Sequence, residues 1–326
     1  MAVYTQVSDD TLAAFLADYD IGEPRALKGI AEGVENSNFY LETTQDRYIL
    51  TLFEKRANPE DLPWFVALTE HLAGQSFPCA SPIAARDGKA LRQLEGKPAL
   101  IVEFLTGISP RKPNLNQCRA FGVALAQMHG ALVGFTTKRE NDLGPDGWAK
   151  LWAGRAEDAD KLDPGLSTLI DQDMSLIASL WPRAESLPNG AIHADLFPDN
   201  TFFIGDDFTG AFDFYFACTD FLAYDLAVCL NAWAFEDGAE YNFSKGAALL
   251  SGYQSVRPLA EAERAALPLL ARGAAMRFFL TRLVDWYGTP ADALVKPHNP
   301  LDFAARLRFH RQAKSAEDYG HGLENS

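Results

Sequence analysis

The sequence predicts an α+β protein of two lobes, in which a small, mostly antiparallel β lobe precedes a larger, mostly helical lobe. Short β-like segments separated by turn residues occupy the first third of the chain. Long segments with apolar residues at helical spacing occupy most of the rest. The length of 326 residues is also more typical of two lobes than of one compact domain. We place the N-terminal lobe at residues 1–105 and the C-terminal lobe at residues 106–326.

The N-terminal lobe is predicted to begin with a helix, because apolar residues recur at helical spacing from Leu12 to Tyr19, after the possible N-cap Ser8. A second helix is expected over 60–74, with Pro63 in its first turn. Between and after these helices, six segments have the composition of short strands. They are residues 26–31, 38–43, 47–53, 82–85, 90–94 and 99–105.

The C-terminal lobe is predicted to consist mainly of long helices, because its apolar residues recur with a helical period. The predicted helical stretches are residues 116–132, 147–161, 166–182, 219–235, 241–256 and 259–287. The exception is 190–214, which reads as a loop with β-like pieces at 201–204 and 211–213, and in which 205–210 is a turn. The polar last dozen residues are predicted to form a frayed tail.

Composition limits the kinds of partner that the protein can have. The net charge of −15 argues against nucleic acid and anionic membranes, which both need a cationic surface. The four cysteines lack Cys-x-x-Cys spacing, so we expect buried, reduced thiols and no metal site made from them. The sequence shows neither a signal-peptide pattern nor an apolar run of membrane-spanning length. We expect a cytoplasmic monomer or homodimer that acts on small molecules.

The stretch His193-Ala-Asp195-Leu-Phe-Pro-Asp-Asn200 matches the His-x-Asp-x-x-x-x-Asn pattern of a phosphotransfer loop. Phosphoryl transfer from ATP needs a carboxylate near the attacking hydroxyl and oxygen ligands for Mg²⁺. Asp195 is therefore the expected base, and Asn200 and Asp213 are the expected metal ligands. His193 is expected to bond the backbone beneath the loop. In the alternative interpretation, Asp and Asn only form turns in a surface loop.

Three further motifs accompany this loop. They are Phe-Gly-x-x-Leu-Ala-x-x-His at 121–129, Ala211-Phe-Asp213, and Asp220-Phe-Leu-Ala-Tyr-Asp225. With these motifs in this order, the chain resembles the aminoglycoside phosphotransferase and choline kinase superfamily. The resemblance implies a protein-kinase-like fold, in which Asp225 supports the catalytic loop. Asp220 is also a possible helix N-cap.

Other segments narrow the resemblance. Gly33-Val-Glu-Asn-Ser-Asn-Phe-Tyr40, Tyr48-Ile-Leu-Thr-Leu-Phe-Glu54 and the stretch from Arg272 to Leu283 are similar to the bacterial homoserine kinases of this superfamily. The similarity runs from about residue 3 to about residue 315. It implies transfer of the ATP γ-phosphate to the side-chain hydroxyl of L-homoserine, which gives O-phospho-L-homoserine, a step of threonine biosynthesis.

The expected nucleotide site departs from the wider kinase pattern in two ways. Its phosphate loop has only one glycine, Gly33, so Asn36, Ser37 and Asn38 would have to cover the phosphates with backbone and side-chain donors. Thr51 occupies the strand position where many relatives have an ATP-binding lysine. Candidates to replace that lysine are Lys55, Arg56 and Lys28, and candidates for its usual glutamate partner are Glu60 and Glu70.

The adenine contact is expected at Glu103-Phe-Leu105, where the β lobe ends before Gly107, although an ordinary strand exit would look the same. Homoserine also brings a carboxylate. Arg277 or Arg282, on an otherwise apolar helix, could bind it in a bidentate manner. The alternative for these arginines is an internal salt bridge, for instance with Asp285 or Asp225.

Two other functions remain open from the sequence. One is a kinase for a different acceptor, such as choline, ethanolamine, methylthioribose or an aminoglycoside. A quaternary ammonium would need an aromatic cage. The residues that could supply one, if they are not core residues, are Trp233, Phe235, Trp286 and Tyr287. The other is a non-catalytic nucleotide-binding pseudokinase, which the missing lysine suggests but which has no need of Asp195.

Overall fold

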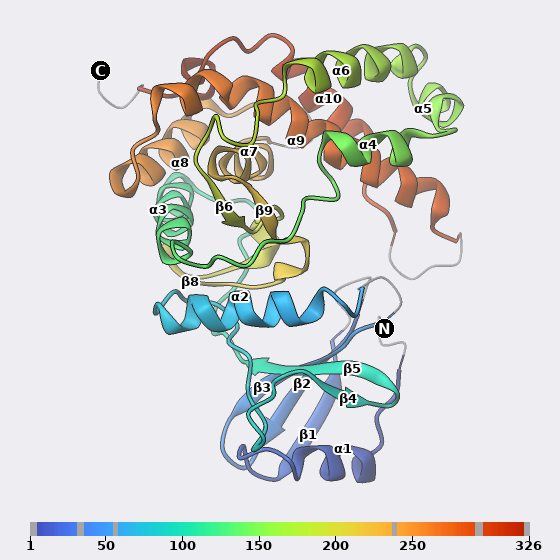
Figure 1. The fold of residues 1–326 in the computed structure, drawn as a ribbon, viewed down its shortest axis with the longest axis vertical. Coiled ribbons are helices and arrows are strands. Elements are labelled where there is room, and N and C mark those ends of the chain that lie inside the picture. The colour runs from blue at the N-terminus through green and yellow to red at the C-terminus, as the bar shows by residue number, and fades with distance from the viewer. Residues whose placement is uncertain (1–4, 31–35, 55–57, 237–239, 291–295, 323–326) are drawn as a thin grey trace. The chain divides into compact units, whose positions relative to one another are not determined.

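The computed structural model describes residues 5–30, 36–54, 58–236, 240–290 and 296–322 (Figure 1). The chain divides into two compact units. The first comprises Met1–Thr106 and Gly210–Tyr215, and the second comprises Gly107–Thr209 and Phe216–Ser326. The segment Gly210–Tyr215, which contains Asp213, therefore belongs to the first unit although it lies far along the chain.

The first unit is built on an antiparallel sheet with the strand order β1-β2-β3-β5-β4 (Figure 1). Along β2, buried residues alternate with partly exposed ones, because successive side chains of a strand point to opposite faces. Phe39 and Leu41 of β2 join Leu50 and Leu52 of β3 in the core of the unit. The strands are β1 (Pro24–Gly29), β2 (Ser37–Thr43), β3 (Arg47–Leu52), β4 (Arg92–Leu94) and β5 (Lys97–Glu103).

Two helices accompany this sheet. Helix α1 (Asp9–Leu16) begins as predicted at Ser8, whose Oγ accepts a hydrogen bond from the Thr11 N–H at 3.2 Å. Its Leu12 and Leu16 pack into the same core as the strands. Helix α2 (Leu62–Gly74) has Pro63 in its first turn, also as predicted, because the first N–H groups of a helix need no partner within it.

The prediction of a strand at 82–85 is wrong. The structure has a single bridge there, between Pro82 and Val102, and the Ile83 N–H donates to Ile101 O at 2.8 Å. Because Pro82 lacks an N–H, it cannot continue a ladder of backbone hydrogen bonds.

The second unit is mainly helical, and α9 packs against both α7 and α10 (Figure 1). Helices α3 and α8 approach closely at two glycines. A Cβ on Gly122 would lie 2.1 Å from Leu249 O, and one on Gly252 would lie 2.1 Å from Arg119 O. The helices are α3 (Leu115–Ala131), α4 (Pro145–Trp152), α5 (Ala156–Leu162), α6 (Leu166–Leu180), α7 (Leu222–Trp233), α8 (Phe243–Val256), α9 (Glu261–Gly288) and α10 (Leu301–His310).

Two pairs of short strands flank the predicted catalytic loop and the segment after it. β6 (Asn189–Ile192) pairs with β9 (Cys218–Phe221), and β7 (Thr201–Ile204) pairs with β8 (Asp207–Ala211). The predicted turn at 205–210 is therefore mostly strand. The strand predicted at 211–213 instead ends at Ala211, so Asp213 follows it.

Three other predictions for the second unit need correction. The stretch 147–161 is two helices, since Gly154 takes a positive φ of 73° between them. Asp220 does not cap α7, because it lies within β9 and the N-cap is Phe221. The predicted tail is partly ordered, because Tyr319 is fully buried and its hydroxyl hydrogen-bonds to His310 Nδ1 at 2.9 Å.

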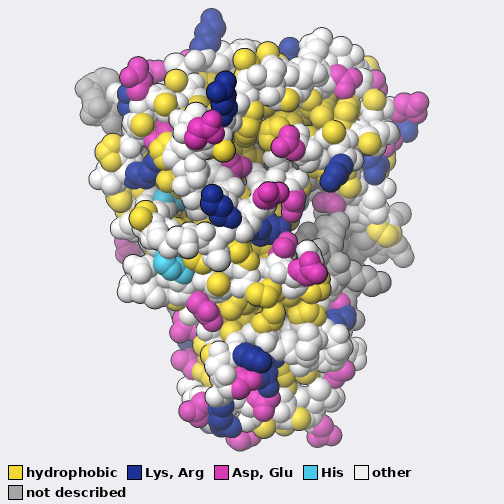
Figure 2. Space-filling model, in the orientation of Figure 1, with side chains coloured by type: hydrophobic (Ala, Val, Ile, Leu, Met, Phe, Trp, Pro, Cys, Tyr) yellow, Lys and Arg dark blue, Asp and Glu magenta, His cyan; other side chains and the backbone are white. Residues whose placement is uncertain are grey.

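The surface agrees with the acidic composition. On the face shown in Figure 2, lysine and arginine side chains are scattered among aspartate and glutamate side chains. Of the helices in the described ranges, none has both the length and the apolar character that a membrane span requires.

Candidate active site

The loop after β6 is held from below by a buried carboxylate on α7. Asp225 has no exposed surface, and its two oxygens accept the N–H of Ala194 at 2.7 Å and the N–H of His193 at 3.0 Å. Ala194 has a φ of 62°, in the left-handed region that side chains other than glycine rarely adopt. The carboxylate of Asp225 therefore stabilises a backbone turn that would otherwise be strained, directly before Asp195.

A chain of hydrogen bonds fixes His129 on the other side of Asp225. Arg257 Nη1 donates to the Tyr253 hydroxyl oxygen at 2.9 Å, and this hydroxyl lies 2.8 Å from His129 Nδ1. Because arginine can only donate, the tyrosine proton points to Nδ1. His129 Nε2 then carries the imidazole proton and donates it to Asp225 Oδ2 at 3.1 Å.

The charge of Asp225 is maintained by these contacts. Burial acts to raise the pKa of its carboxyl, but the hydrogen bond from His129, electrostatic attraction to the His129 and His193 side chains, and the backbone hydrogen bond from His193 outweigh burial and lower that pKa. A carboxylate that stays ionised is the stronger acceptor for the two loop N–H groups.

The loop itself brings His193, Asp195 and Asn200 together. The Asp195 N–H donates to His193 Nδ1 at 3.2 Å, which is the backbone contact expected for a scaffold histidine. Asn200 Nδ2 donates to Asp195 O at 2.8 Å and to Asp195 Oδ2 at 3.2 Å. Its Oδ1 makes no hydrogen bond to any described residue. Asn200 therefore orients the Asp195 carboxylate and offers an amide oxygen of the kind that Mg²⁺ binds.

Arg277 is engaged with this loop and with neither aspartate suggested by the sequence. It is 2% exposed, its Nη1 donates to Ala194 O, and its Nη2 lies 3.9 Å from Asp195 Oδ1. Its guanidinium lies over the Phe278 ring at 4.5 Å. The expected internal ion pair thus exists, but its partner is the predicted base.

Arg282 contacts α10. Its Nη1 is 3.4 Å from Asn299 O and 3.5 Å from Asp302 Oδ2, and it lies over the Phe303 ring at 4.5 Å. The guanidinium of Arg306 lies over the same ring, 4.3 Å from its centroid. Sequence reasoning missed Arg306, because α10 was not among the predicted helices. The sequence feature that could have indicated it is an arginine between Phe303 and Leu307, which are both buried on the inward face of α10.

Asp213 lies in the first unit, two residues after the end of β8. It is exposed and has a φ of 65°. Tyr215, two residues on, packs edge-on against Phe53 at 5.0 Å and Phe65 at 5.8 Å. Burial and the charge of Asp213 raise the pKa of Tyr215. An exposed carboxylate on a turn anchored by aromatic packing has the chemistry of a magnesium ligand.

Thr51 takes part in a small polar link within this unit. Its hydroxyl donates to Asn38 Oδ1 at 2.8 Å and also bonds the phenol of Tyr215. The pairing of Asn38 with Thr51, and of Lys28 with Tyr40, places Lys28, Asn38 and Thr51 on the same face of the sheet. Among the three candidate replacements for the lysine, Lys28 is therefore an exposed cation on the face of Thr51. Lys55 and Arg56, like Gly33, lie outside the described residues.

Ser37 is fully buried at the start of β2, and its hydroxyl donates to Glu54 Oε1 at 2.6 Å. Lys97 forms an ion pair with Glu54, and Thr5 donates to Glu54 at 2.8 Å. Asn36 Oδ1 accepts the Glu54 N–H at 3.3 Å. These contacts engage the Ser37 hydroxyl within the protein.

The remaining predicted residues of the first unit lie at the end of β5 and near α2. The Glu103 N–H donates to Ser81 O at 2.9 Å. Leu105 lies two residues after the end of β5 in the sequence. Glu60 and Glu70 both have exposed side chains. Among the described residues, no group of three or more His, Cys, Asp or Glu side chains is arranged to hold a metal.

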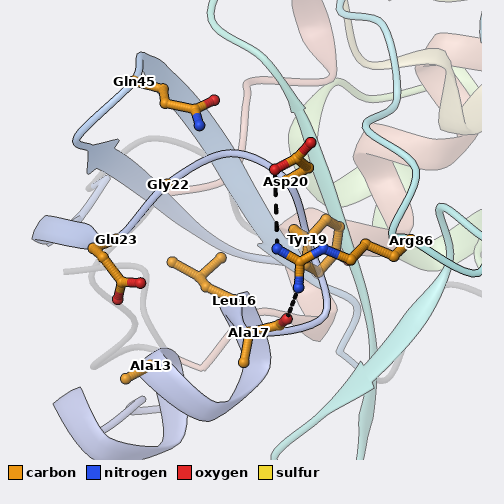
Figure 3. Close-up of a pocket in the computed structure, with 9 residues that line it drawn as sticks. All are labelled: Ala13, Leu16, Ala17, Tyr19, Asp20, Gly22, Glu23, Gln45 and Arg86. Carbon is orange, nitrogen blue, oxygen red and sulfur yellow. Dashed lines mark hydrogen bonds and ion pairs between the residues drawn. The ribbon is translucent and has the colours of Figure 1, made fainter.

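A cavity of about 320 Å³ lies in the first unit at the end of α1 (Figure 3). Its Arg86 donates to Ala17 O at 2.5 Å and lies 3.9 Å from Asp20 Oδ1. None of the predicted site residues lines it. The lining residues are Ala13, Leu16, Ala17, Tyr19, Asp20, Gly22, Glu23, Gln45 and Arg86.

The fold and the loop geometry define a phosphotransferase of the protein-kinase-like class. Residues 26–259 match the phosphotransferase enzyme family. Among solved structures, the chain is similar to a microcompartment-associated aminopropanol kinase, with a TM-score of 0.69 and 18% identity over 97% of this chain and 100% of that one. It is also similar to the amicoumacin kinase hAmiN, with a TM-score of 0.66 and 17% identity over 97% and 94%. At these identities the structures support the fold.

Two relatives match over nearly their whole length. The chain is 61% identical to the homoserine kinase of Hyphomonas neptunium, over 98% of this chain and 100% of the relative. It is 53% identical to the homoserine kinase of Xanthobacter autotrophicus, over 98% and 99%. The chain belongs to the homoserine kinase family, within the phosphotransferase enzyme family.

Proposed function

We propose that this protein is an ATP-dependent homoserine kinase, which phosphorylates the side-chain hydroxyl of L-homoserine to give O-phospho-L-homoserine. The observation that carries the proposal is the supported loop around Asp195, in a chain that is 61% identical to a relative named homoserine kinase. The same relatives disfavour the other acceptors, namely choline, ethanolamine, methylthioribose and aminoglycosides, and the pseudokinase.

Asp195 is the proposed base. Its carboxylate is 18% exposed, is oriented by Asn200 Nδ2, and lies beside the cation of Arg277. It accepts the proton of the acceptor hydroxyl as the phosphoryl group is transferred. The hydrogen bonds of Asp225 to the backbone before it hold Asp195 in place, so that little reorganisation is needed during the reaction.

Asn200 and Asp213 are the proposed magnesium ligands. Both offer oxygen atoms, which Mg²⁺ prefers. When bound, the ion neutralises charge on the transferred phosphoryl group. Nucleotide contacts are proposed at Gly33, Asn36, Ser37 and Asn38 for the phosphates, and at the backbone of Glu103 and Leu105 for adenine.

Two of the four aromatic residues considered for a quaternary-ammonium cage, Trp233 and Phe235, are core residues, whereas Trp286 and Tyr287 are exposed. Trp233 is buried, stacks on Phe121 at 4.0 Å, and donates from Nε1 to Leu196 O at 2.8 Å. Phe235 packs edge-on against Tyr241 at 5.1 Å. Both therefore serve the core, as expected in the simpler interpretation.

We also propose that the enzyme works in the cytoplasm, as a monomer or a homodimer. The four cysteines are free and buried, which suits a reducing compartment. Burial raises the pKa of Cys79 and of Cys118 to about 12, so their thiols stay protonated and unreactive at neutral pH.

Replacing Asp195 by Asn tests the proposed base. The change keeps the size of the side chain but removes the proton acceptor, so kcat should fall by about 10²- to 10⁴-fold while ATP binding is nearly kept. Asp199→Asn is the matched control, because Asp199 lies in the same loop with an exposed side chain. It should retain kcat within a few-fold. Activity that survives Asp195→Asn would exclude Asp195 as the base.

A further inference from the structure

Three arginines of the second unit lie on one aromatic cluster beside the catalytic loop. Phe278 of α9 and Phe303 of α10 stack at 5.1 Å, and Phe197 of the loop packs edge-on against Phe278 at 4.9 Å. Arg277 lies over Phe278, and Arg282 and Arg306 both lie over Phe303. The cluster therefore fixes these cations close to the loop that carries Asp195.

Two of the three arginines have a carboxylate partner within the protein. Arg277 is 3.9 Å from Asp195 and also bonds Ala194 O. Arg282 is 3.5 Å from Asp302. Both charges are thus at least partly balanced.

Arg306 is different. Its Nη1 donates to a backbone oxygen, Asn231 O, and not to a carboxylate. Its Nε, like the Nε of Arg277, is buried with no hydrogen-bond partner. No carboxylate of the described residues lies within ion-pair distance of it. Burial, and then the neighbouring charge of Arg282, lower the pKa of Arg306 to about 10, although the charge of Asp302 acts in the opposite direction. A partly buried cation without a neighbouring anion is unfavourable, so an anion that binds here would be stabilised by the charge of Arg306.

We propose that Arg306, with Arg282 beside it, binds the carboxylate of the acceptor amino acid. This inference rests on the proposed function, since it assigns a part of the substrate to a part of that same site. The planar guanidinium of an arginine matches a carboxylate with two parallel hydrogen bonds. Arg277, which the sequence made an equal candidate, already uses its guanidinium to hold the loop.

The assignment explains how the acceptor is selected. An amino alcohol without a carboxylate leaves Arg306 without an anion, and an unpaired buried charge discriminates strongly against such a ligand. L-homoserine supplies the missing charge. The site therefore favours amino-acid acceptors over simple amino alcohols.

The test compares two acceptors that differ only in the carboxylate, L-homoserine and 3-amino-1-propanol. Arg306→Gln removes the charge and keeps a polar side chain. Because a charged hydrogen-bonded partner is lost, kcat/KM for L-homoserine should fall by on the order of 10²-fold, mostly through KM. The same ratio for 3-amino-1-propanol should change by less than a few-fold. Arg306→Lys should recover part of the loss with L-homoserine.

The matched control is Arg308→Gln. Arg308 lies on the same helix, but it is exposed and pairs with Asp163 at 2.5 Å, so both acceptors should be unaffected. The inhibition constant of L-2-aminobutyrate, which has the carboxylate but no hydroxyl, gives a second measurement that does not depend on turnover of the amino alcohol. Arg306→Gln should raise it in parallel with the KM for L-homoserine.

Two outcomes would overturn the inference. Equal losses on both acceptors, or an unchanged inhibition constant of L-2-aminobutyrate, would make Arg306 a structural residue and leave the proposed function intact. Wild-type enzyme that does not phosphorylate L-homoserine would overturn the proposed function itself, and this would be seen before any variant is compared.

Discussion

At the scale of single residues, the site depends on groups whose protonation is set by their neighbours. Asp225 holds the backbone of His193 and Ala194, and His129 donates to the same carboxylate. The tautomer of His129 follows from Arg257 and Tyr253, which lie up to two hydrogen bonds away from it. Tyr253 and Arg257 are therefore positioning residues that act on the catalytic loop through His129 and Asp225.

Tyr253→Phe tests this chain of contacts. The variant loses the hydrogen bond from the Tyr253 hydroxyl to His129 Nδ1, which fixes the orientation of the imidazole beside Asp225. We expect kcat to fall by about 10-fold, with little change in the KM for ATP, because the loop that carries Asp195 is held less firmly. Steady-state kinetics measures this, and a kcat equal to that of the wild type would contradict it.

At the scale of elements, the close approach of α3 and α8 depends on glycines. Gly122→Ala should destabilise the protein by about 1–3 kcal/mol or more, because its Cβ would lie 2.1 Å from the Leu249 carbonyl oxygen, which is backbone and cannot turn away. Gly130→Ala, on the same helix with open space around it, should instead be neutral or stabilising by up to about 1 kcal/mol. Urea denaturation of both variants measures the difference. Equal effects would show that α3 and α8 are not packed as described.

The end of α10 makes stability depend on pH. Burial, followed by the charges of Arg306 and Arg272, lowers the pKa of His310 from 6.5 to about 3. Below pH 6.5 the unfolded chain takes up a proton that the folded protein accepts only near pH 3. The free energy of unfolding should therefore fall as the pH drops through this window, by up to about 1.4 kcal/mol per pH unit from this residue.

His310→Gln should flatten that dependence, since glutamine does not titrate. Denaturation midpoints at pH 7 and pH 5 measure the slope. His321→Gln is the control, because His321 is only partly buried and its Nδ1 is 3.9 Å from Glu317. A His310 variant with the slope of the wild type would contradict the assignment.

At the scale of the whole molecule, much of the fold follows from local patterns in the sequence. Helix α1 was predictable because its N-cap Ser8 and its apolar spacing are clear. Strands β2 and β3 were predictable from their strand-like composition and the turn between them. The candidate catalytic loop at residues 193–200 could be proposed from the sequence, because phosphoryl transfer needs fixed residue types at fixed spacing. Helix α10 was not predicted, since its inward face includes an arginine and a histidine whose hydrogen-bond partner, Asn231, lies more than seventy positions away in the sequence.

Contacts between residues far apart in the sequence also explain why some candidate-site residues could not be assigned from the sequence. The engagement of Ser37 with Glu54 joins residues 17 positions apart, and the contact of Arg277 with Ala194 joins residues 83 positions apart. The charge on Arg306 becomes informative only when its surroundings are known. Spacing along the chain carries none of this information, because packing decides which polar groups find partners.

The most direct test of the account is the acceptor of the purified wild-type protein. ADP release with ATP and Mg²⁺ should require L-homoserine, and ³¹P NMR should show a phosphomonoester on its side-chain hydroxyl. Choline and aminoglycosides at the same concentration should give no release above background. ADP release with choline at a comparable rate, or none with L-homoserine, would contradict the assignment of this chain as a homoserine kinase.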